Sequence, residues 1–439
     1  MNPELRRNLW LELTTHRLAA MPLAIFLVCV LFASRNVSDW QGAVFSTAVG
    51  MFIVIVHLWG TYKASEALTD EVRDRTWDWQ RLSALDPWRM TWGKLAGATA
   101  LSWYGAFLCV VAMAIAVLGG FERRELAILV CALVASGVAV HGAALAASLQ
   151  ASRKSSKLGH RIGLLFFFPA AAVGLMTLAS SGEARPEAIE WYGHRFESIR
   201  FHCALAVIFA LWAVLAAYRE MARELKLRLL PWAYPAFAIF LAILFAGYGL
   251  GPTSTRTTLA LAGLIASLGL TYYGLFADVT TAMSLRRIAT HWQARQWRRV
   301  IEELPLWLTT LLLALPFALR CAQILSEDPV LSVVPKAVAF YPIAIWLLAV
   351  RDCAIYVFFA LSPRARGPEG ATLLYIALLS WVVPAVLAVA GMGAVARLLM
   401  PFGSMNGGQA SLVMGVQVAI VGVLVAWRWR GRQRAFRAG

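Results

Sequence analysis

The sequence predicts an all-α polytopic membrane protein, and two observations carry this prediction. The chain of 439 residues is 60% hydrophobic and only 15% charged, with a mean hydropathy of +0.66, whereas soluble globular proteins are about half apolar and a quarter charged. Apolar stretches long enough to cross a bilayer, which takes roughly 20 residues of helix, recur along the whole chain. These stretches are continuous rather than alternating, so helices and not a β-barrel are expected.

About twelve such stretches are expected to span the membrane. With both termini assigned to the cytoplasm, the loops on that side hold most of the 40 Lys and Arg residues, which is the asymmetry that orients membrane proteins. The net charge of +16 is therefore attributed to topology and to attraction by anionic lipids, and not to nucleic-acid binding. The expected spans are residues 18–34, 42–62, 94–119, 125–149, 162–180, 201–218, 230–250, 258–277, 305–324, 335–359, 371–394 and 410–427.

Residues 3–16 precede the first span and have the pattern of an interfacial helix. Leu5, Leu9 and Leu13 recur every four residues, and charged side chains occupy other positions, as in a helix that lies along the membrane surface. An ordinary charged flank of the first span is the alternative. No cleavable signal peptide is evident. The six cysteines fall in or beside predicted spans without a CxxC or metal-binding spacing, so neither disulfides nor zinc binding are expected.

The loop of residues 63–94 is the longest strongly charged segment between two apolar stretches. Read as one helix, it is amphipathic, and Glu71 and Arg75 form an i,i+4 ion pair. Pro87 ends this helix, since the residue before a proline is pushed out of the helical conformation, and a second helical stretch begins near Trp88. The alternative is a solvated loop whose tryptophans anchor it at the lipid headgroups.

The order of residues in this loop resembles a known pattern. It is carried by Glu66, Asp70, Glu71, Thr76, Trp77, Asp78, Gln80, Leu82, Pro87 and Gly93-Lys94. In this order the loop resembles the cytoplasmic coupling region of ABC-2 type exporter permeases, in which an interfacial helix precedes the first span and the segment between the second and third spans rests on a separate ATPase. The sequence departs from that family at Arg75, where a glycine often precedes the threonine. The resemblance covers residues 1 to about 220.

The resemblance implies a role for the loop and for a partner. Coupling to the ATPase is assigned to Glu66, Asp70, Glu71, Arg75, Thr76, Trp77, Pro87 and Lys94. The chain has no GxxxxGK[ST] sequence and so cannot cradle ATP phosphates in the P-loop manner. No cofactor is expected in this chain; ATP and Mg are expected on a cytoplasmic ABC ATPase subunit, present in two copies.

The second half of the sequence repeats features of the first, which predicts a 6+6 duplication into residues 1–218 and 219–439. Residues 278–304 form a second long cytoplasmic loop, in which Trp297 and Pro305 have the spacing of Trp79 and Pro87. This loop has lost most of its acidic residues, so the halves are not equivalent, although the ATPase is expected to push on both loops. Outside, residues 181–200 are expected to form a pair of short interfacial or re-entrant helices.

Three ionisable residues within predicted spans are candidates for a translocation path: His141, Arg351 and Asp352. Charges in the hydrocarbon are costly, and such residues commonly mark function. The alternatives are that His141 simply hydrogen-bonds a neighbouring helix, and that Arg351 and Asp352 lie near the cytoplasmic rim or bind another helix.

The sequence thus predicts the permease subunit of an ATP-driven exporter in a bacterial cytoplasmic membrane. One alternative is a membrane-embedded enzyme acting on lipid-type substrates through the same three residues, although no catalytic motif supports it. Another is a proton-coupled secondary transporter using Asp352 or His141, whose halves would more often be inverted than parallel. A non-transporting scaffold is a further alternative, and the substrate is not specified.

Overall fold

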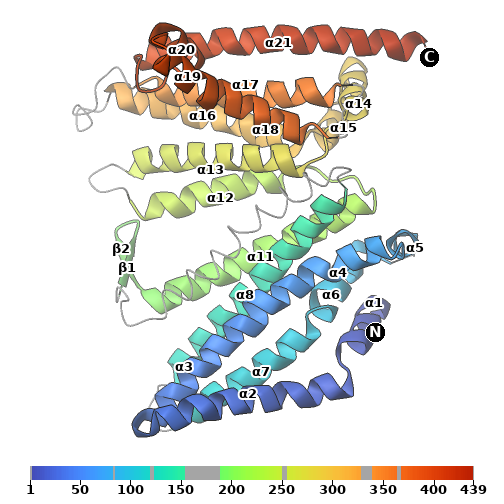
Figure 1. Ribbon diagram of the computed structural model, residues 1–439, viewed down its shortest axis with the longest axis vertical. Coiled ribbons are helices and arrows are strands. Elements are labelled where there is room, and N and C mark those ends of the chain that lie inside the picture. Colours follow the sequence, from blue (N-terminus) through green and yellow to red (C-terminus); the bar gives the residue numbers. More distant parts are fainter. Residues whose placement is uncertain are drawn as a thin grey trace. The chain divides into compact units, whose positions relative to one another are not determined.

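The computed structural model describes residues 2–82, 85–118, 123–153, 188–249, 255–327, 339–362 and 367–438. Its contacts divide the chain into two compact units (Figure 1). Unit 1 contains Met1–Arg153, Gly163–Ile189 and Arg195–Leu229, and unit 2 contains Lys154–Ile162, Glu190–His194 and Leu230–Gly439.

Unit 1 is built almost entirely of helices. One core cluster lies where α8 packs along α11 and α4 and contains Leu68, Leu145 and Met221, and another joins α2, α3 and α7 and contains Phe52 and Met113. The elements are α1 (Pro3–Glu12), α2 (Thr15–Arg35), the 3-10 turn η1 (Val37–Asp39), α3 (Trp40–Phe52), the π-helical η2 (Ile53–Gly60), α4 (Thr61–Arg73), α5 (Trp77–Arg81), α6 (Pro87–Gly97), α7 (Ala100–Ala116), α8 (Arg123–Ser152) and α11 (Ser198–Glu224).

Unit 2 is a second helical bundle. In it α13 packs between α12 and α16, and α17 packs along α21. The elements are α12 (Ala233–Gly247), α13 (Thr255–Ala277), α14 (Ala282–Gln293), α15 (Trp297–Glu303), α16 (Leu306–Glu327), α17 (Tyr341–Ala360), α18 (Glu369–Ala377), the π-helical η5 (Leu378–Val382), α19 (Val383–Val389), α20 (Gly393–Leu399) and α21 (Gly407–Ala438).

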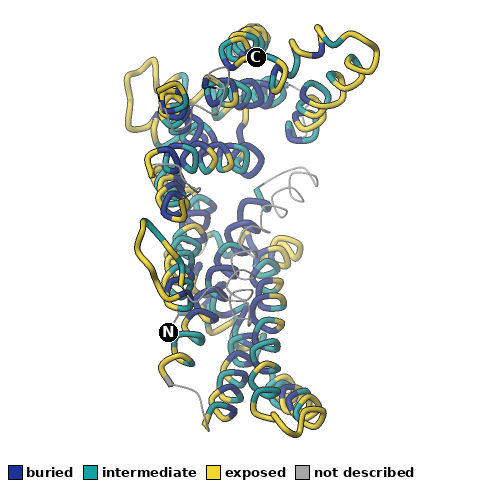
Figure 2. Tube along the Cα trace, turned by 90° about the vertical axis from the view of Figure 1, so that its left-hand side faces the viewer, coloured by how far each residue is buried: buried dark blue, intermediate teal, exposed yellow. Residues whose placement is uncertain are grey.

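Both units place apolar side chains on their outer surfaces. On α2, for example, Leu23, Phe26 and Leu27 are each more than half exposed, and Figure 2 shows buried residues confined to the contacts between helices. Soluble monomers rarely expose apolar patches of this extent. Nine helices in the described part of the chain are long and apolar enough to cross a bilayer. The chain is therefore an all-α polytopic membrane protein.

The expected spans map onto the helices with few changes. Nine of them coincide with the nine long apolar helices. The stretch 94–119 corresponds to α6 and α7, which meet at a bend of 53°, and 230–250 corresponds to the shorter helix α12. The stretch 162–180 lies outside the described residues. The total of twelve spans, the orientation of the termini and the duplication remain predictions.

The loop of residues 181–200 departs from the expectation of paired short helices. Its described part is a two-stranded antiparallel hairpin of β1 (Ala188–Trp191) and β2 (His194–Glu197). Tyr192 and Gly193 connect the strands with φ of 50° and 76°, the double positive φ of a tight two-residue hairpin turn. Glycine in the second turn position makes this connection possible, and the expectation of helices missed that signal.

The part of the charged loop that precedes Pro87 is two helices, α4 and α5, and not one. Helix α4 ends at Arg73, and Arg75 follows in the left-handed conformation with φ of 58°. The Arg75 N–H donates to the Val72 carbonyl at 3.3 Å and the Thr76 N–H donates to the Glu71 carbonyl at 2.9 Å, which is the paired closure of a Schellman C-cap. Because Arg75 leaves the helix, the expected Glu71–Arg75 ion pair does not form.

Candidate functional site

The first feature of the candidate site is a buried lysine in unit 1. Lys94 lies on α6 with its side chain fully buried. Its Nζ donates to Glu4 Oε1 at 3.3 Å, to Gln80 Oε1 at 3.2 Å and, at close range, to a Glu71 carboxylate oxygen. A buried ammonium group is tolerated only when it is paired and its hydrogens are satisfied, and here all three donors have acceptors.

Two glutamates and a second base complete this cluster. Arg7 on α1 bonds Glu71 at 2.7 Å and Glu4 at 3.3 Å, so two basic and two acidic side chains balance in charge. We call Glu4, Arg7, Glu71, Gln80 and Lys94 the Lys94 cluster. It joins α1, α4, α5 and α6, which are separated by up to 90 residues in sequence.

Two glycines allow α1 to lie close enough to α6 for these bonds. A Cβ atom at Gly93 would lie 2.5 Å from the Glu4 Cγ, and one at Gly97 would lie 2.5 Å from the Asn8 Cβ. Asn8 also donates to the Gly93 carbonyl at 3.2 Å. Small residues four positions apart let two helix backbones approach closely, so this pair of glycines explains where α1 is seated.

Trp77, the first residue of α5, connects the Lys94 cluster to a second set of charges. The Lys94 Nζ lies 5.0 Å from the centre of the Trp77 ring, within the range of a cation–π interaction. On its other side, the Trp77 indole N–H donates to Glu224 Oε1 at 3.4 Å. Trp77 is almost completely buried, so it packs inside the protein and not at the headgroups as an exposed tryptophan would.

The second set, which we call the Glu224 cluster, consists of Arg81, Arg153, Glu220 and Glu224. Arg81 bonds Glu224 at 3.1 Å, Arg153 lies 3.7 Å from the other Glu224 oxygen, and Arg153 pairs directly with Glu220. These residues come from α5 and from the ends of α8 and α11. Together the two clusters join six helices at one end of unit 1 (Figure 1).

Helices α4 and α5 and the turns that follow them also carry exposed residues, which we call the exposed strip. Trp79 is 78% and Leu82 81% exposed, so α5 presents two large apolar side chains outside the protein interior. Charged residues of both signs are exposed on the same segment. The members of the exposed strip are Asp70, Arg73, Asp74, Arg75, Asp78, Trp79 and Leu82.

The residues assigned to coupling therefore divide into two groups. Glu71, Trp77 and Lys94 are buried and hold helices together, whereas Asp70 and Arg75 are exposed. Glu66 is partly exposed and accepts hydrogen bonds from Tyr62 and Lys63.

Two further assigned residues shape the backbone of this region. The Thr76 hydroxyl donates to the Glu71 carbonyl at 3.3 Å. Pro87 begins α6, behind an Asp86 N-cap whose carboxylate accepts from the Trp88 N–H at 3.0 Å, an arrangement that suits a proline at the first helical position. None of these positions tests the assignment to coupling, which remains a prediction.

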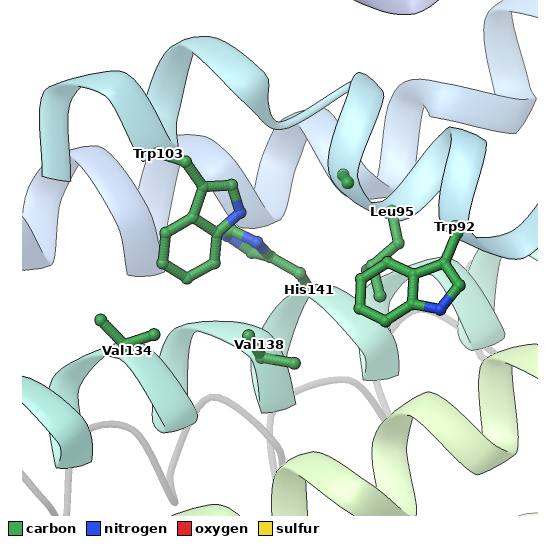
Figure 3. A pocket seen from close by; sticks show the side chains of 7 residues that line it. Trp92, Leu95, Trp103, Val134, Val138 and His141 are labelled. Atoms are coloured by element: carbon green, nitrogen blue, oxygen red, sulfur yellow. The ribbon is translucent and has the colours of Figure 1, made fainter. Parts of the chain in front are cut away.

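His141 lies in the interior of unit 1 beside a small cavity (Figure 3). Its Nε2 donates to the Val56 carbonyl at 2.8 Å, and its ring meets the Trp103 ring edge-on with centroids 5.3 Å apart. The histidine thus hydrogen-bonds a neighbouring helix, as one alternative expected. The cavity has a volume of about 170 Å³ and is lined by Trp92, Leu95, Ala96, Trp103, Val134, Val138 and His141.

Arg351 and Asp352 form a fully bonded buried pair in unit 2. The Arg351 guanidinium donates to Asp352 Oδ1 at 2.8 and 3.0 Å, to Gln417 Oε1 at 2.8 Å and to Ser380 Oγ at 2.7 Å. Tyr272 donates to the other Asp352 oxygen at 2.8 Å. The pair thus binds α13, η5 and α21, in agreement with the alternative that it binds other helices.

Glu4, Arg7 and Glu224, the partners of the assigned residues, were not predicted from the sequence. The sequence did contain one signal for Glu4. A lysine on an apolar helix, such as Lys94, requires a buried acidic partner, and Glu4 lies on the amphipathic helix that precedes the first span. Nothing in the sequence connects Glu224 to Trp77, since 147 residues separate them.

The comparisons with known proteins identify no relative of this chain. The sequence matches no family model, no curated protein and no solved structure. Fold and site together define the class of the protein as a helical multi-pass membrane protein.

Proposed function

We propose that this chain is the permease subunit of an ATP-driven ABC-2 type exporter in a bacterial cytoplasmic membrane. One observation carries the proposal: helices α4 and α5, which carry the exposed strip, are joined to four other helices of unit 1 by ion pairs whose acidic members are buried. An exposed apolar pair on a segment with charges of both signs has the composition of a protein-docking surface. A separate ATPase, in two copies and carrying the ATP and Mg, would bind there.

The buried clusters give this docking surface a mechanical role. A force on α5 reaches α6 and α1 through Trp77 and the Lys94 cluster, and it reaches α8 and α11 through the Glu224 cluster. Breaking a buried ion pair costs about 3–5 kcal/mol, so these contacts resist separation when the ATPase closes. The helices would therefore move together as a block and open a path outward.

The test is affinity purification of the full chain from its native membrane in mild detergent, with identification of co-purifying proteins and assay of ATP hydrolysis. The informative variant is Trp79→Ala/Leu82→Ala, because both side chains are exposed and contribute little to the fold. Loss of a hot spot worth about 2 kcal/mol lowers partner recovery about thirtyfold. The matched control is Trp10→Ala on α1, where the side chain is equally exposed outside the exposed strip.

A stoichiometric partner with a Walker sequence, retained by the control and lost with the strip variant, is the expected result. A preparation without any ATPase would overturn the proposal and turn attention to the lipid-enzyme and proton-driven alternatives. His141, Arg351 and Asp352 would then be the first residues to change.

A further inference from the structure

The second cytoplasmic loop contains a helix pair, α14 and α15, with the same local geometry as α4 and α5. Helix α14 ends in a Schellman closure in which Arg295 has φ of 54° and the Gln296 N–H donates to the His291 carbonyl at 2.9 Å. Trp297 then begins α15, as Trp77 begins α5. Because the two helix pairs share a backbone shape, differences in the burial and charge of their side chains indicate different binding partners.

Hydrogen bonds fix this helix pair to the ends of two apolar helices. Asp278, just after α13, accepts the Leu306 N–H of α16 at 3.1 Å, and the Trp307 indole N–H donates to Thr280 at 3.2 Å. Since α13 and α16 are both long enough to span a bilayer, their joined ends define a point at the membrane surface. Helices α14 and α15 begin and end at that point.

The apolar face of α14 is only partly covered by protein, since Leu285 and Ile288 are partly buried and Trp292 is exposed. Leu285, Ile288 and Trp292 recur at the i, i+3, i+7 spacing of one helix face, yet no residue of α14 is buried within the described part of the chain. Trp292 and Met283 are each more than half exposed. In contrast, α4 buries Ala64, Leu68 and Glu71 against its neighbours.

The charge of the two helix pairs is also different. Residues 282–303 contain five arginines against two glutamates, whereas residues 61–81 contain four basic against five acidic side chains. A helix with a partly exposed apolar face, tryptophans and an excess of arginine is the type that lies in a bilayer interface and is attracted by anionic lipids.

We propose that α14 and α15 form a binding surface for anionic phospholipid headgroups. Ile288 and Trp292 enter the interfacial layer, and the arginines bind phosphate oxygens with charge-assisted hydrogen bonds. The surface thus serves membrane attachment in unit 2 and is not a second docking site for a protein. This assignment depends on the membrane class of the chain and not on its transport activity.

The experiment uses the full chain in nanodiscs of phosphatidylcholine alone or mixed with phosphatidylglycerol. A nitroxide is placed at Ile288→Cys on the apolar face, or at Thr290→Cys on the exposed face, after Cys131 and Cys203 are changed to serine. Accessibility to oxygen and to a water-soluble nickel complex reports whether each label is in lipid or in water. The expected result is immersion of the label at 288, deeper with phosphatidylglycerol, and an aqueous label at 290.

Charge variants test the anionic component. Each arginine near an anionic surface contributes about fivefold to binding, so Arg287→Gln and Arg298→Gln should each lower the ratio of immersed to aqueous label at 288 about fivefold. The matched controls, Arg73→Gln and Arg89→Gln in unit 1, should leave the ratio of immersed to aqueous label at 288 unchanged. Equal immersion in both lipids, an aqueous label at 288, or protection that appears only after addition of a co-purifying ATPase would each overturn the proposal.

Discussion

Replacing Lys94 with methionine tests whether the Lys94 cluster holds unit 1 together. The variant keeps most of the side-chain volume but removes the ammonium that bonds Glu4 and Glu71. Both carboxylates remain buried, and Arg7 alone, itself 40% exposed, faces them. Leaving a buried charge without its partner costs about 3–5 kcal/mol, and loss of the cation–π contact with Trp77 adds about 0.5–2 kcal/mol.

The triple variant Glu4→Gln/Glu71→Gln/Lys94→Met separates this cost from a simple packing defect. It removes every buried charge of the cluster, and replacing a whole buried ion cluster is often neutral. We therefore expect the triple variant to recover most of the stability that Lys94→Met loses, because Arg7 can turn toward water.

Reversible unfolding of the full chain in mixed detergent and SDS micelles, followed by tryptophan fluorescence, measures these free energies. Lys63→Met is the matched control: Lys63 is 26% exposed and pairs with Glu66 at 3.5 Å, a contact worth less than about 1 kcal/mol. A loss for Lys94→Met no larger than the control, or a triple variant as unstable as the single one, would refute the reasoning.

Three further predictions concern the backbone and the second unit. Arg75→Gly should raise the free energy of unfolding by up to about 1 kcal/mol, because glycine adopts the left-handed conformation without a steric penalty. Gly93→Leu should displace α1 from α6 and increase hydrogen exchange of the α1 amides, since even a Cβ would lie 2.5 Å from Glu4. Arg351→Met should cost about 3–5 kcal/mol by leaving Asp352 buried with fewer partners, and Arg351→Met/Asp352→Leu should recover most of this.

Each of these has an outcome that contradicts it. The prediction for Arg75→Gly is wrong if its free energy of unfolding in mixed micelles is more than about 1 kcal/mol below that of the parent chain. Unchanged exchange of α1 would mean that the close approach at Gly93 is not what seats that helix. Equal losses for the single and double variants at Arg351 would show that packing, not charge, sets the cost there.

The apolar helices could be predicted from the sequence because each is a long continuous signal that needs no knowledge of its neighbours. The break between α4 and α5 could not be placed, since an arginine occupies the left-handed position where a glycine would have marked it.

The candidate site could be predicted only in part, because the sequence shows local patterns and not the contacts between distant helices. Charge and amphipathicity identify residues such as Asp70 as exposed, but they cannot separate Glu71, which is buried, from an acidic residue one position away. Burial at Glu71 depends on Arg7 and Lys94, which come from other helices, and pairings over such sequence distances leave no local pattern.

The order of charges along the chain has a consequence for biogenesis. Glu4 is synthesised 90 residues before Lys94, a delay of about 5–20 seconds at ordinary rates of translation. Glu71 also precedes the lysine, so both carboxylates are already present when α6 emerges. Lys94 is therefore synthesised after both of its counter-ions, and a slow step at this stage would leave acidic helices, rather than a lone buried lysine, exposed to the insertion machinery.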